Sequence, residues 1–413
     1  MKVLMVNKFF YIKGGSETYY FALRRLLESH GHQVVDFSME DARNFDSPTS
    51  RFFVAHTDYA NAGSPAGKFR AAANIVYSFE AKRKFEALVR EEQPDLVHLH
   101  LFQHQISPSI LQVIKKYNLP TVYTAHDLKM VCLNYKMMHH GRICEDCKGG
   151  SLLPCLKNRC VKESLLKSAV NVCEGILHRL LRSYDAIDAI ITPSAFYKRK
   201  FQAFGVPGER IVHIPNFLDA KTPEAAKRPE LGRYFLYLGR LSEEKGVMTL
   251  IRAVQGTNLR LLIAGTGPLQ EAIAQYLAAH PSLNVTLLGF KSGQELTDLI
   301  YNARAVVLPS EWYENGPYSA IEALQLSRPL LCADIGGLPE LIAGNGYLFP
   351  AGDADTLRQR LLDMDCLDDG AYKAMERASR ALFDSVYTQE PHYAALMQVY
   401  ARAAAAHQHN PSF

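Results

Sequence analysis

The fold is decided by residues 311–324, which read EWYENGPYSAIEAL. The apolar run before them, residues 305–309, predicts a buried strand. Apolar residues at helical spacing follow, and Pro317 suits the first position of the helix that they predict. A helix beginning there directs the unpaired N–H groups of Tyr318 and Ser319 outward, toward an anion. This stretch therefore predicts a ligand site at the carboxyl end of a strand, where open α/β sheets bind ligands.

Two carboxylates flank the predicted helix start. Glu314 lies in the loop before it, and Glu322 lies inside the helix, eight residues later. Such a pair suits a ligand that carries hydroxyl groups. It also suits a solvated loop carboxylate followed by a solvated helix carboxylate. The stretch alone leaves both interpretations open, so other parts of the chain have to decide between them.

Composition narrows the classes of protein. The 413 residues predict two or three domains, and 48% hydrophobic and 21% charged residues are typical of a globular protein. A net charge of +4 does not favour a nucleic-acid partner, which needs a clustered basic face. Residues 1–6 form too short an apolar run for a signal peptide and predict a first strand. We expect a cytoplasmic protein with reduced thiols.

A glycine turn precedes the opening stretch. Residues 239–246 read GRLSEEKG and follow a predicted strand. Arg240 offers a bidentate fork and Lys245 a mobile point charge, which together suit a diphosphate. An ordinary surface charge cluster is the alternative. A further turn, with Gly265 and Gly267, follows the next predicted strand.

The first half repeats the alternation of strands and helices. A predicted strand at 2–6, the pair Gly14–Gly15 and a predicted helix at 18–30 form a nucleotide-type unit. The glycine pair allows a ligand to approach the backbone, although an ordinary turn explains it as well. His126 ends a predicted strand, which favours a functional position. Two such halves predict two parallel-sheet domains that face each other across a cleft.

Taken in order, these motifs resemble those of the family-four retaining glycosyltransferases, the glycosyl transferase group 1 type. One matching element is the E-x7-E spacing from Glu314 to Glu322, with Gly316 between them. The others are GRLSEEKG at residues 239–246 and TAHD at residues 124–127. The resemblance covers nearly the whole chain. It implies an α/β, GT-B architecture, with two Rossmann-like parallel-sheet domains facing across a cleft. Residues 217–219, FLD, depart from the commoner Gly-Ile-Asp.

The resemblance also implies a division of the chain. Residues 1–215 would form an N-terminal, acceptor-side Rossmann-like domain with a cysteine-bearing insertion at about 132–160. Residues 216–232 would be a linker, and 233–385 a C-terminal Rossmann-like domain that binds the nucleotide sugar. Residues 386–413 would form a helix that crosses back to the N-terminal domain.

The function implied by the resemblance is retaining transfer of a sugar from a nucleotide-diphosphate sugar to a saccharide or lipid-linked acceptor, in cell-surface or exopolysaccharide synthesis. The implied catalytic residues are His126, Arg240, Lys245 and Glu314. The implied donor-binding residues are Gly14, Gly15, Gly239, Gly265, Gly267, Asn315, Gly316, Pro317, Tyr318, Ser319 and Glu322. No cofactor is required for catalysis, since Arg240 and Lys245 can neutralise the diphosphate. A non-catalytic nucleotide-sugar-binding subunit and another GT-B enzyme, such as a nucleotide-sugar epimerase, stay open.

Cysteines crowd the predicted insertion. Cys144 and Cys147 form a C-x2-C pair, a spacing that favours zinc. Cys132 and Cys160 complete a four-thiolate set in this hypothesis, with Cys155 as a substitute. Such a closed set would be structural, because it leaves no open coordination position. Free thiols are the second interpretation and disulfides the third.

Two basic segments have amphipathic patterns, at residues 68–90 and 162–182. Each predicts a surface helix. The sharper interpretation is peripheral contact with an anionic membrane surface, at the inner face of the membrane, or with a lipid-linked acceptor.

Overall fold

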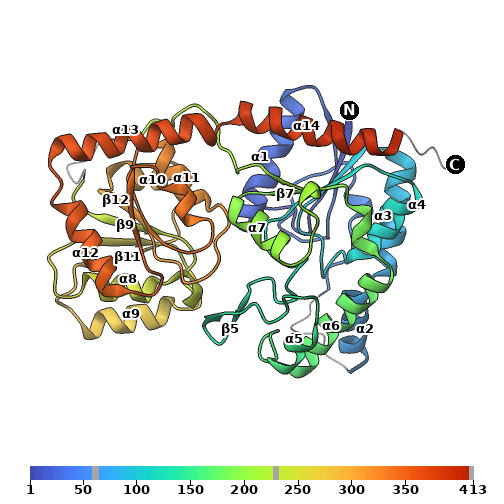
Figure 1. Cartoon of the computed structure of the whole chain (residues 1–413), viewed down its shortest axis with the longest axis horizontal. Helices are drawn as coiled ribbons and strands as arrows, with labels where there is room; N and C mark the ends of the chain where they lie inside the picture. Colours follow the sequence, from blue (N-terminus) through green and yellow to red (C-terminus); the bar gives the residue numbers. More distant parts are fainter. Residues whose placement is uncertain (58–64, 227–231, 409–413) are drawn as a thin grey trace.

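The computed structural model describes residues 1–57, 65–226 and 232–408. Part of the predicted linker, residues 227–231, and the end of the predicted C-terminal segment, residues 409–413, lie outside the described residues. The described chain forms two parallel six-stranded sheets, each covered by helices (Figure 1). The predicted α/β class with two parallel-sheet domains is therefore confirmed.

The first sheet has the strand order β2-β1-β3-β4-β7-β8, with every neighbouring pair parallel. Its strands β3 and β4 are buried along their whole length because helices cover both faces. The bounds are β1 (Lys2–Val6), β2 (Gln33–Phe37), β3 (Leu96–Leu99), β4 (Thr121–Thr124), β7 (Ala189–Thr192) and β8 (Ile211–His213).

The second sheet has the order β11-β10-β9-β12-β13-β14, again all parallel. The order reverses between β9 and β12, and a crevice at the carboxyl ends of such neighbouring strands is where doubly wound sheets bind ligands. The bounds are β9 (Phe235–Leu238), β10 (Leu261–Ala264), β11 (Val285–Gly289), β12 (Ala305–Leu308), β13 (Leu330–Ala333) and β14 (Gly346–Phe349). The sheet thus brings the 239–246 turn beside the 311–324 stretch.

Helices of the first half are α1 (Gly15–Ser29), α2 (Pro65–Val76), α3 (Phe79–Glu92), α4 (Leu111–Lys116), α5 (Leu153–Lys157), α6 (Leu165–Leu180) and α7 (Ala195–Ala203), with a small hairpin of β5 (Met138–His139) and β6 (Arg142–Ile143). The single helix predicted at 68–90 is wrong. The chain breaks before Phe79 because Ser78 caps α3, its Oγ accepting from the Ala81 N–H at 3.1 Å.

Helices of the second half are α8 (Val247–Val254), α9 (Gln270–Ala279), α10 (Gly293–Asn302), α11 (Tyr318–Gln325), α12 (Ala354–Asp365), α13 (Asp369–Val386) and α14 (Gln389–Gln408). The short helix α8 shows why they form: it buries Val247, Leu250, Ile251 and Val254. Residues three and four apart share one helix face, so this spacing makes a single apolar stripe that packs on the second core.

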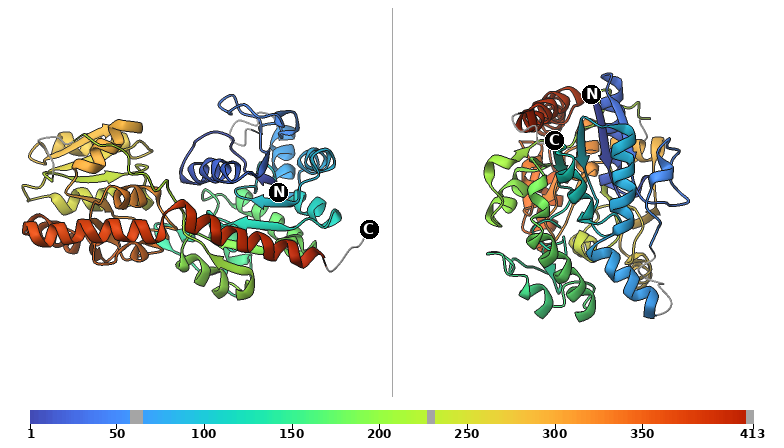
Figure 2. Two further views of the ribbon diagram at one scale, coloured as in Figure 1. Left: turned by 90° about the horizontal axis from the view of Figure 1, so that it is seen from above. Right: turned by 90° about the vertical axis from the view of Figure 1, so that its right-hand side faces the viewer.

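The last two helices connect the halves of the molecule. α13 packs on α11 beside the second sheet, and α14 continues along the first-sheet side (Figure 2). The Tyr400 hydroxyl lies 2.7 Å from His98 Nδ1, and the Tyr19 hydroxyl lies 3.1 Å from His392 Nε2. All four side chains are buried, so these bonds hold α14 against the first domain. Among the described helices, none is both long and apolar enough to cross a bilayer.

Candidate active site

An ion pair between a half-buried lysine and a buried carboxylate lies at the carboxyl edge of the second sheet. Lys245 Nζ is 2.6 Å from Glu314 Oε1, and Ser310 Oγ donates to the same oxygen at 2.6 Å. Burial raises the pKa of the Glu314 carboxyl, but the Lys245 charge and the hydrogen bonds outweigh it, so the pKa is lowered below its usual value. Glu314 is therefore a charged carboxylate at neutral pH.

The backbone behind Glu314 has no room for a side chain. The Gly337 N–H donates to the Glu314 carbonyl at 2.7 Å. Gly336 has a φ of +65°, and a Cβ there would lie 2.5 Å from the Glu314 nitrogen. Glycine at 336 is thus needed to hold the Glu314 loop in place.

The two predicted glycine turns pack on each other. The Leu241 N–H donates to the Thr266 carbonyl at 3.0 Å, and a Cβ on Gly265 would lie 1.9 Å from the Gly239 oxygen. A Cβ on Gly267 would likewise meet the Leu241 carbonyl at 2.3 Å. Backbone packing alone therefore accounts for glycine at 265 and 267, whether or not they also contact a donor.

Arg240 extends from this turn and is exposed. Its positive charge acts on Lys13 of the first domain. Burial lowers the pKa of the Lys13 ammonium, and the positive charges of Lys8 and Arg240 lower that pKa further. Burial also lowers the pKa of Lys8. The pKa of Lys13, in the first domain, thus responds to the positive charge of Arg240 in the second. The sequence analysis missed Lys8 and Lys13, although both stand in the loop that ends at Gly14.

Two helix N-termini meet across the domain junction. α11 begins at Tyr318, one residue later than predicted, with Pro317 as its N-cap. α1 begins at Gly15, with Gly14 as its N-cap. A Cβ on Gly15 would lie 3.5 Å from the Tyr318 ring, so the helix starts approach closely. The structure therefore brings together the predicted residues at both helix starts, with Ser319 in the first turn of α11.

Glu322 lies within α11 and is half-buried. Burial raises the pKa of its carboxyl to about 7. Its side chain makes no hydrogen bond or ion pair with any other residue in the described part of the chain. A carboxylate held in this way gains by accepting hydrogen bonds from a ligand.

Asn315 and Gly316 face the first domain instead. Asn315 Nδ2 donates to the Ala125 carbonyl at 3.0 Å, and its Oδ1 accepts from Ser194 Oγ at 2.9 Å. Asn216 Nδ2 donates to the Gly316 carbonyl at 2.8 Å. These contacts join the two domains directly behind Glu314. Asn216 escaped the sequence analysis because it was assigned to the linker.

His126 follows β4 and is neutral. Its Nε2 lies 3.1 Å from His100 Nδ1, and its ring meets that of Tyr19 edge-on at 5.2 Å. Burial lowers the pKa of His126 to about 3. His126 can therefore donate or accept a hydrogen bond at neutral pH but cannot supply a positive charge.

Five cysteine side chains lie close together in the cysteine-bearing insertion. A small cavity of about 20 Å³ is lined by Cys132, Cys144, Cys147, Cys155 and Cys160, and all five are free cysteines. Burial raises the pKa of the Cys147 thiol to about 11. In residues 1–57, 65–226 and 232–408, no group of three or more histidine, cysteine or acidic side chains has an arrangement that could hold a metal ion. The predicted ligands are thus neighbours without a formed metal site.

The same insertion touches the loop that carries Glu314. Glu145 Oε1 accepts from the Tyr313 hydroxyl at 2.7 Å and pairs with Lys200. Lys136 Nζ lies 3.4 Å from Glu244 Oε1, next to Lys245. The insertion therefore connects the first domain to both sides of the Lys245–Glu314 pair, a contact that its sequence did not indicate.

Known proteins match both halves of this arrangement. Residues 13–222 match the family model Glycosyltransferase Family 4, and residues 219–380 match Glycosyl transferases group 1. The crystal structure of Anabaena Alr3699/HepE in complex with UDP has a TM-score of 0.65 and 15% identity, covering 97% of this chain and 100% of that chain. The fold is thus that of the GT-B glycosyltransferases.

The chain belongs to Glycosyltransferase Family 4. A glycogen synthase from Mycobacterium tuberculosis is 33% identical over 52% of this chain and 54% of its own length. A putative colanic acid biosynthesis glycosyltransferase, WcaL of Escherichia coli, is 27% identical over 49% of this chain and 54% of its own length. The chain thus matches about half the length of these curated relatives.

The Lys245–Glu314 ion pair predicts a pH-dependent stability defect when its cation is removed. Lys245→Met leaves the Glu314 carboxylate buried without its cation, so the pKa of Glu314 should rise above the unfolded value of ~4.3. A group with a raised pKa loses stability as pH increases past the unfolded value. We expect the unfolding free energy of the variant to fall short of wild type by about 1–3 kcal/mol at pH 7 and by less at pH 5.

Urea unfolding at both pH values measures this defect. Glu314→Gln in the Lys245→Met background removes the titrating group, so its defect should not change with pH. A Lys245→Met defect that is equal at pH 5 and pH 7 would contradict the assignment of the pair.

Proposed function

We propose that this protein is a retaining glycosyltransferase that moves a sugar from a nucleotide-diphosphate sugar to an acceptor in cell-surface or exopolysaccharide synthesis. The observation that carries the proposal is the Lys245–Glu314 pair, which lies beside the start of α11 at the domain junction. UDP in the HepE structure and the colanic acid relative support the donor class and the setting. We place the reaction in the cytoplasm, with the acceptor at the inner face of the membrane.

In this proposal the second domain holds the donor. Arg240 and Lys245 neutralise the diphosphate as it leaves, and the first-turn N–H groups of α11 at Tyr318 and Ser319 add positive potential. Glu322 accepts hydrogen bonds from the ribose hydroxyls. Most of the developing charge lies on the leaving diphosphate, so cations fixed in advance are the main catalytic device.

The sugar would lie between the domains. Glu314 contacts the sugar hydroxyls and stabilises positive character at the anomeric carbon, and Lys245 holds this carboxylate in position at 2.6 Å. Neutral His126 contacts the sugar by hydrogen bonding from the first domain. Gly14 and Gly15 allow the start of α1 to close over it. No step of this scheme requires a cofactor.

Arg240→Ala gives the cleanest test of the diphosphate role. Arg240 is exposed, so the unfolding midpoint should stay that of wild type, whereas turnover should fall by about 10²–10³-fold because a charge that stabilises the transition state is lost. Arg377→Ala removes an exposed arginine on α13 and serves as the matched control. Turnover is measured by release of nucleoside diphosphate across a panel of nucleotide sugars and acceptors.

The same assay separates the remaining alternatives. Early NMR spectra of the product should show that the anomeric configuration of the donor is kept; inversion would refute a retaining enzyme. An altered sugar nucleotide formed without an acceptor would identify an epimerase. Donor binding without turnover across the panel would identify a non-catalytic subunit. Wild-type turnover in Arg240→Ala would exclude the cationic role of Arg240.

Glu322 predicts a pH dependence of nucleotide binding. Its carboxyl has a pKa of about 7 in the free protein, and ribose hydroxyls donate best to the ionised form. Affinity for UDP should therefore fall as pH drops below 7, by at most about tenfold per pH unit. Calorimetry at pH 6 and pH 8 measures the difference. Glu322→Gln should bind more weakly at pH 8 and lose the part of the pH dependence that UDP ionisation does not explain. Equal pH dependence in both proteins would refute the ribose role.

For the insertion we propose a structural zinc ion held by four thiolates, with Cys132, Cys144, Cys147 and Cys160 as ligands and Cys155 as substitute. The support is the gathering of these thiols around one cavity. Purified protein should contain about one zinc per chain, and chelation should lower its melting temperature. Cys366→Ser, an exposed thiol on the other domain, should keep the metal, whereas Cys147→Ser should lose it. Substoichiometric zinc and an unchanged melting temperature would remove the hypothesis.

A further inference from the structure

Helix α6 buries mainly polar residues and exposes several leucines. The buried side chains are Ser168, Asn171, Glu174 and His178, together with Val172. The opposite face exposes Leu165, Leu166, Ile176 and Leu180, with exposed fractions of 54%, 76%, 48% and 77%. A surface helix of a globular protein has the reverse arrangement. The apolar stripe of α6 therefore needs an explanation other than the core of the domain.

The inner face of α6 is fixed by polar contacts. Lys129 Nζ lies 2.9 Å from Glu174 Oε2 and 2.7 Å from Asn171 Oδ1, all of them buried. His178 Nε2 lies 2.9 Å from the Val76 carbonyl, and its Nδ1 lies 2.9 Å from Ser183 Oγ. Rotating α6 to bury its leucines would break this network and leave a buried charge unpaired, which is strongly unfavourable. The leucines thus stay at the surface.

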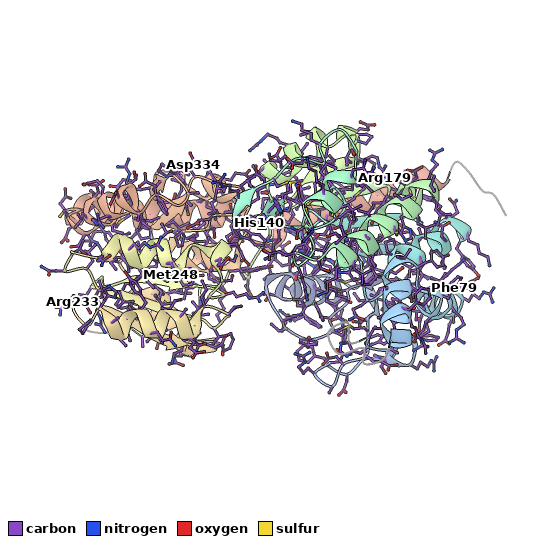
Figure 3. All side chains as sticks on the ribbon, turned by 90° about the horizontal axis from the view of Figure 1, so that it is seen from below. Phe79, His140, Arg179, Arg233, Met248 and Asp334 are labelled. Atoms are coloured by element: carbon purple, nitrogen blue, oxygen red, sulfur yellow. The ribbon has the colours of Figure 1, made fainter. Side chains whose placement is uncertain are left out.

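Other helices of the first domain also expose large apolar side chains. Phe69 of α2, Phe79 at the start of α3 and Leu153 of α5 are 78%, 77% and 69% exposed. α2 and α5 both pack against α6, and the three helices lie at the end of the first domain opposite α14 (Figure 1). Figure 3 shows Phe79 and Arg179 on this same domain. We name these three side chains and the exposed apolar side chains of α6 the α6 surface.

The charges around the α6 surface are mainly positive. Between residues 157 and 182 the exposed acid is Glu163, since Glu174 is buried. The exposed cations in the same range are Lys157, Arg159, Lys162, Lys167, Arg179 and Arg182, of which Arg182 pairs with the exposed Asp185. A segment that exposes leucine together with lysine and arginine has the composition that suits the boundary between lipid headgroups and acyl chains.

We propose that the α6 surface docks on an anionic lipid bilayer, with its leucine and phenylalanine side chains entering the headgroup boundary and its cations facing anionic headgroups. A second copy of the chain fits less well, because a symmetric contact would place the same cations against each other. The consequence for a lipid-linked acceptor rests on the proposed function: Lys129 follows His126 by three residues, so α6 is tied to the loop at the carboxyl end of β4. Bilayer binding itself does not depend on that function.

Vesicle co-sedimentation of the full chain tests the proposal. Wild type should bind vesicles of equimolar phosphatidylcholine and phosphatidylglycerol, bind phosphatidylcholine vesicles weakly, and lose affinity as salt screens the charges. Leu166→Asp with Leu180→Asp should lower binding at least about tenfold, because apolar area and headgroup attraction both decrease. Lys167→Glu with Arg179→Glu should do the same for anionic vesicles.

Matched controls lie on the other domain. Phe290→Asp changes a phenylalanine that is 72% exposed, and Lys373→Glu reverses an exposed charge; both should bind as wild type does. All substituted side chains are exposed, and unfolding midpoints check that the variants fold. No vesicle binding by wild type, equal binding to both vesicle types, or unchanged binding by the α6 variants would overturn the proposal. So would a wild-type dimer that the leucine variants dissociate without vesicles. Vesicle binding without sugar transfer would refute only the proposed function.

Discussion

The active-site arrangement depends on one buried carboxylate that has to remain charged. Glu314 follows β12, a strand whose four residues are apolar and buried, and burial there disfavours its ionised form. Lys245 and Ser310 reverse that effect at 2.6 Å each. Because these partners come from two loops, the loops after β9 and β12 have to stay in register. The packing of Gly336 against the Glu314 backbone also holds the Glu314 loop in position.

The loop that carries Glu314 itself makes hydrogen bonds between the two domains. Asn315, immediately after Glu314, bonds Ala125 and Ser194 of the first domain, and Glu340 accepts from the Ala195 and Phe196 N–H groups at 2.9 and 2.7 Å, capping α7 from the other domain. The conformation described is thus one in which the first domain already contacts the donor loop. A change in the angle between the domains would have to exchange these hydrogen bonds, which couples domain motion to the position of Glu314.

The cysteine-bearing insertion and α6 give the first domain its individual features. The insertion reaches Tyr313 through Glu145, while the residues just before it reach α6 through the buried Lys129–Glu174 pair. The route from the leucine stripe to the donor loop therefore runs through the segment at residues 126–145. A ligand or surface that orders residues 126–145 would therefore affect both α6 and the loop that carries Tyr313 and Glu314.

The sequence by itself determined the two parallel sheets, because alternating strands, helices and glycine turns have periodicities that do not depend on distant contacts. It also determined where Glu314, Lys245 and the α11 start lie along the chain. Only the tertiary structure decided what each side chain faces. Asn315 bonds the other domain, Gly265 and Gly267 pack on backbone, and the charge of Arg240 acts on Lys13, all through residues far apart in sequence. The prediction of a single helix at 68–90 was wrong because the Ser78 cap starts a new helix despite the continuous periodicity. The α6 leucines are exposed because the buried face of α6 is mainly polar, and its polar partners lie elsewhere in the chain.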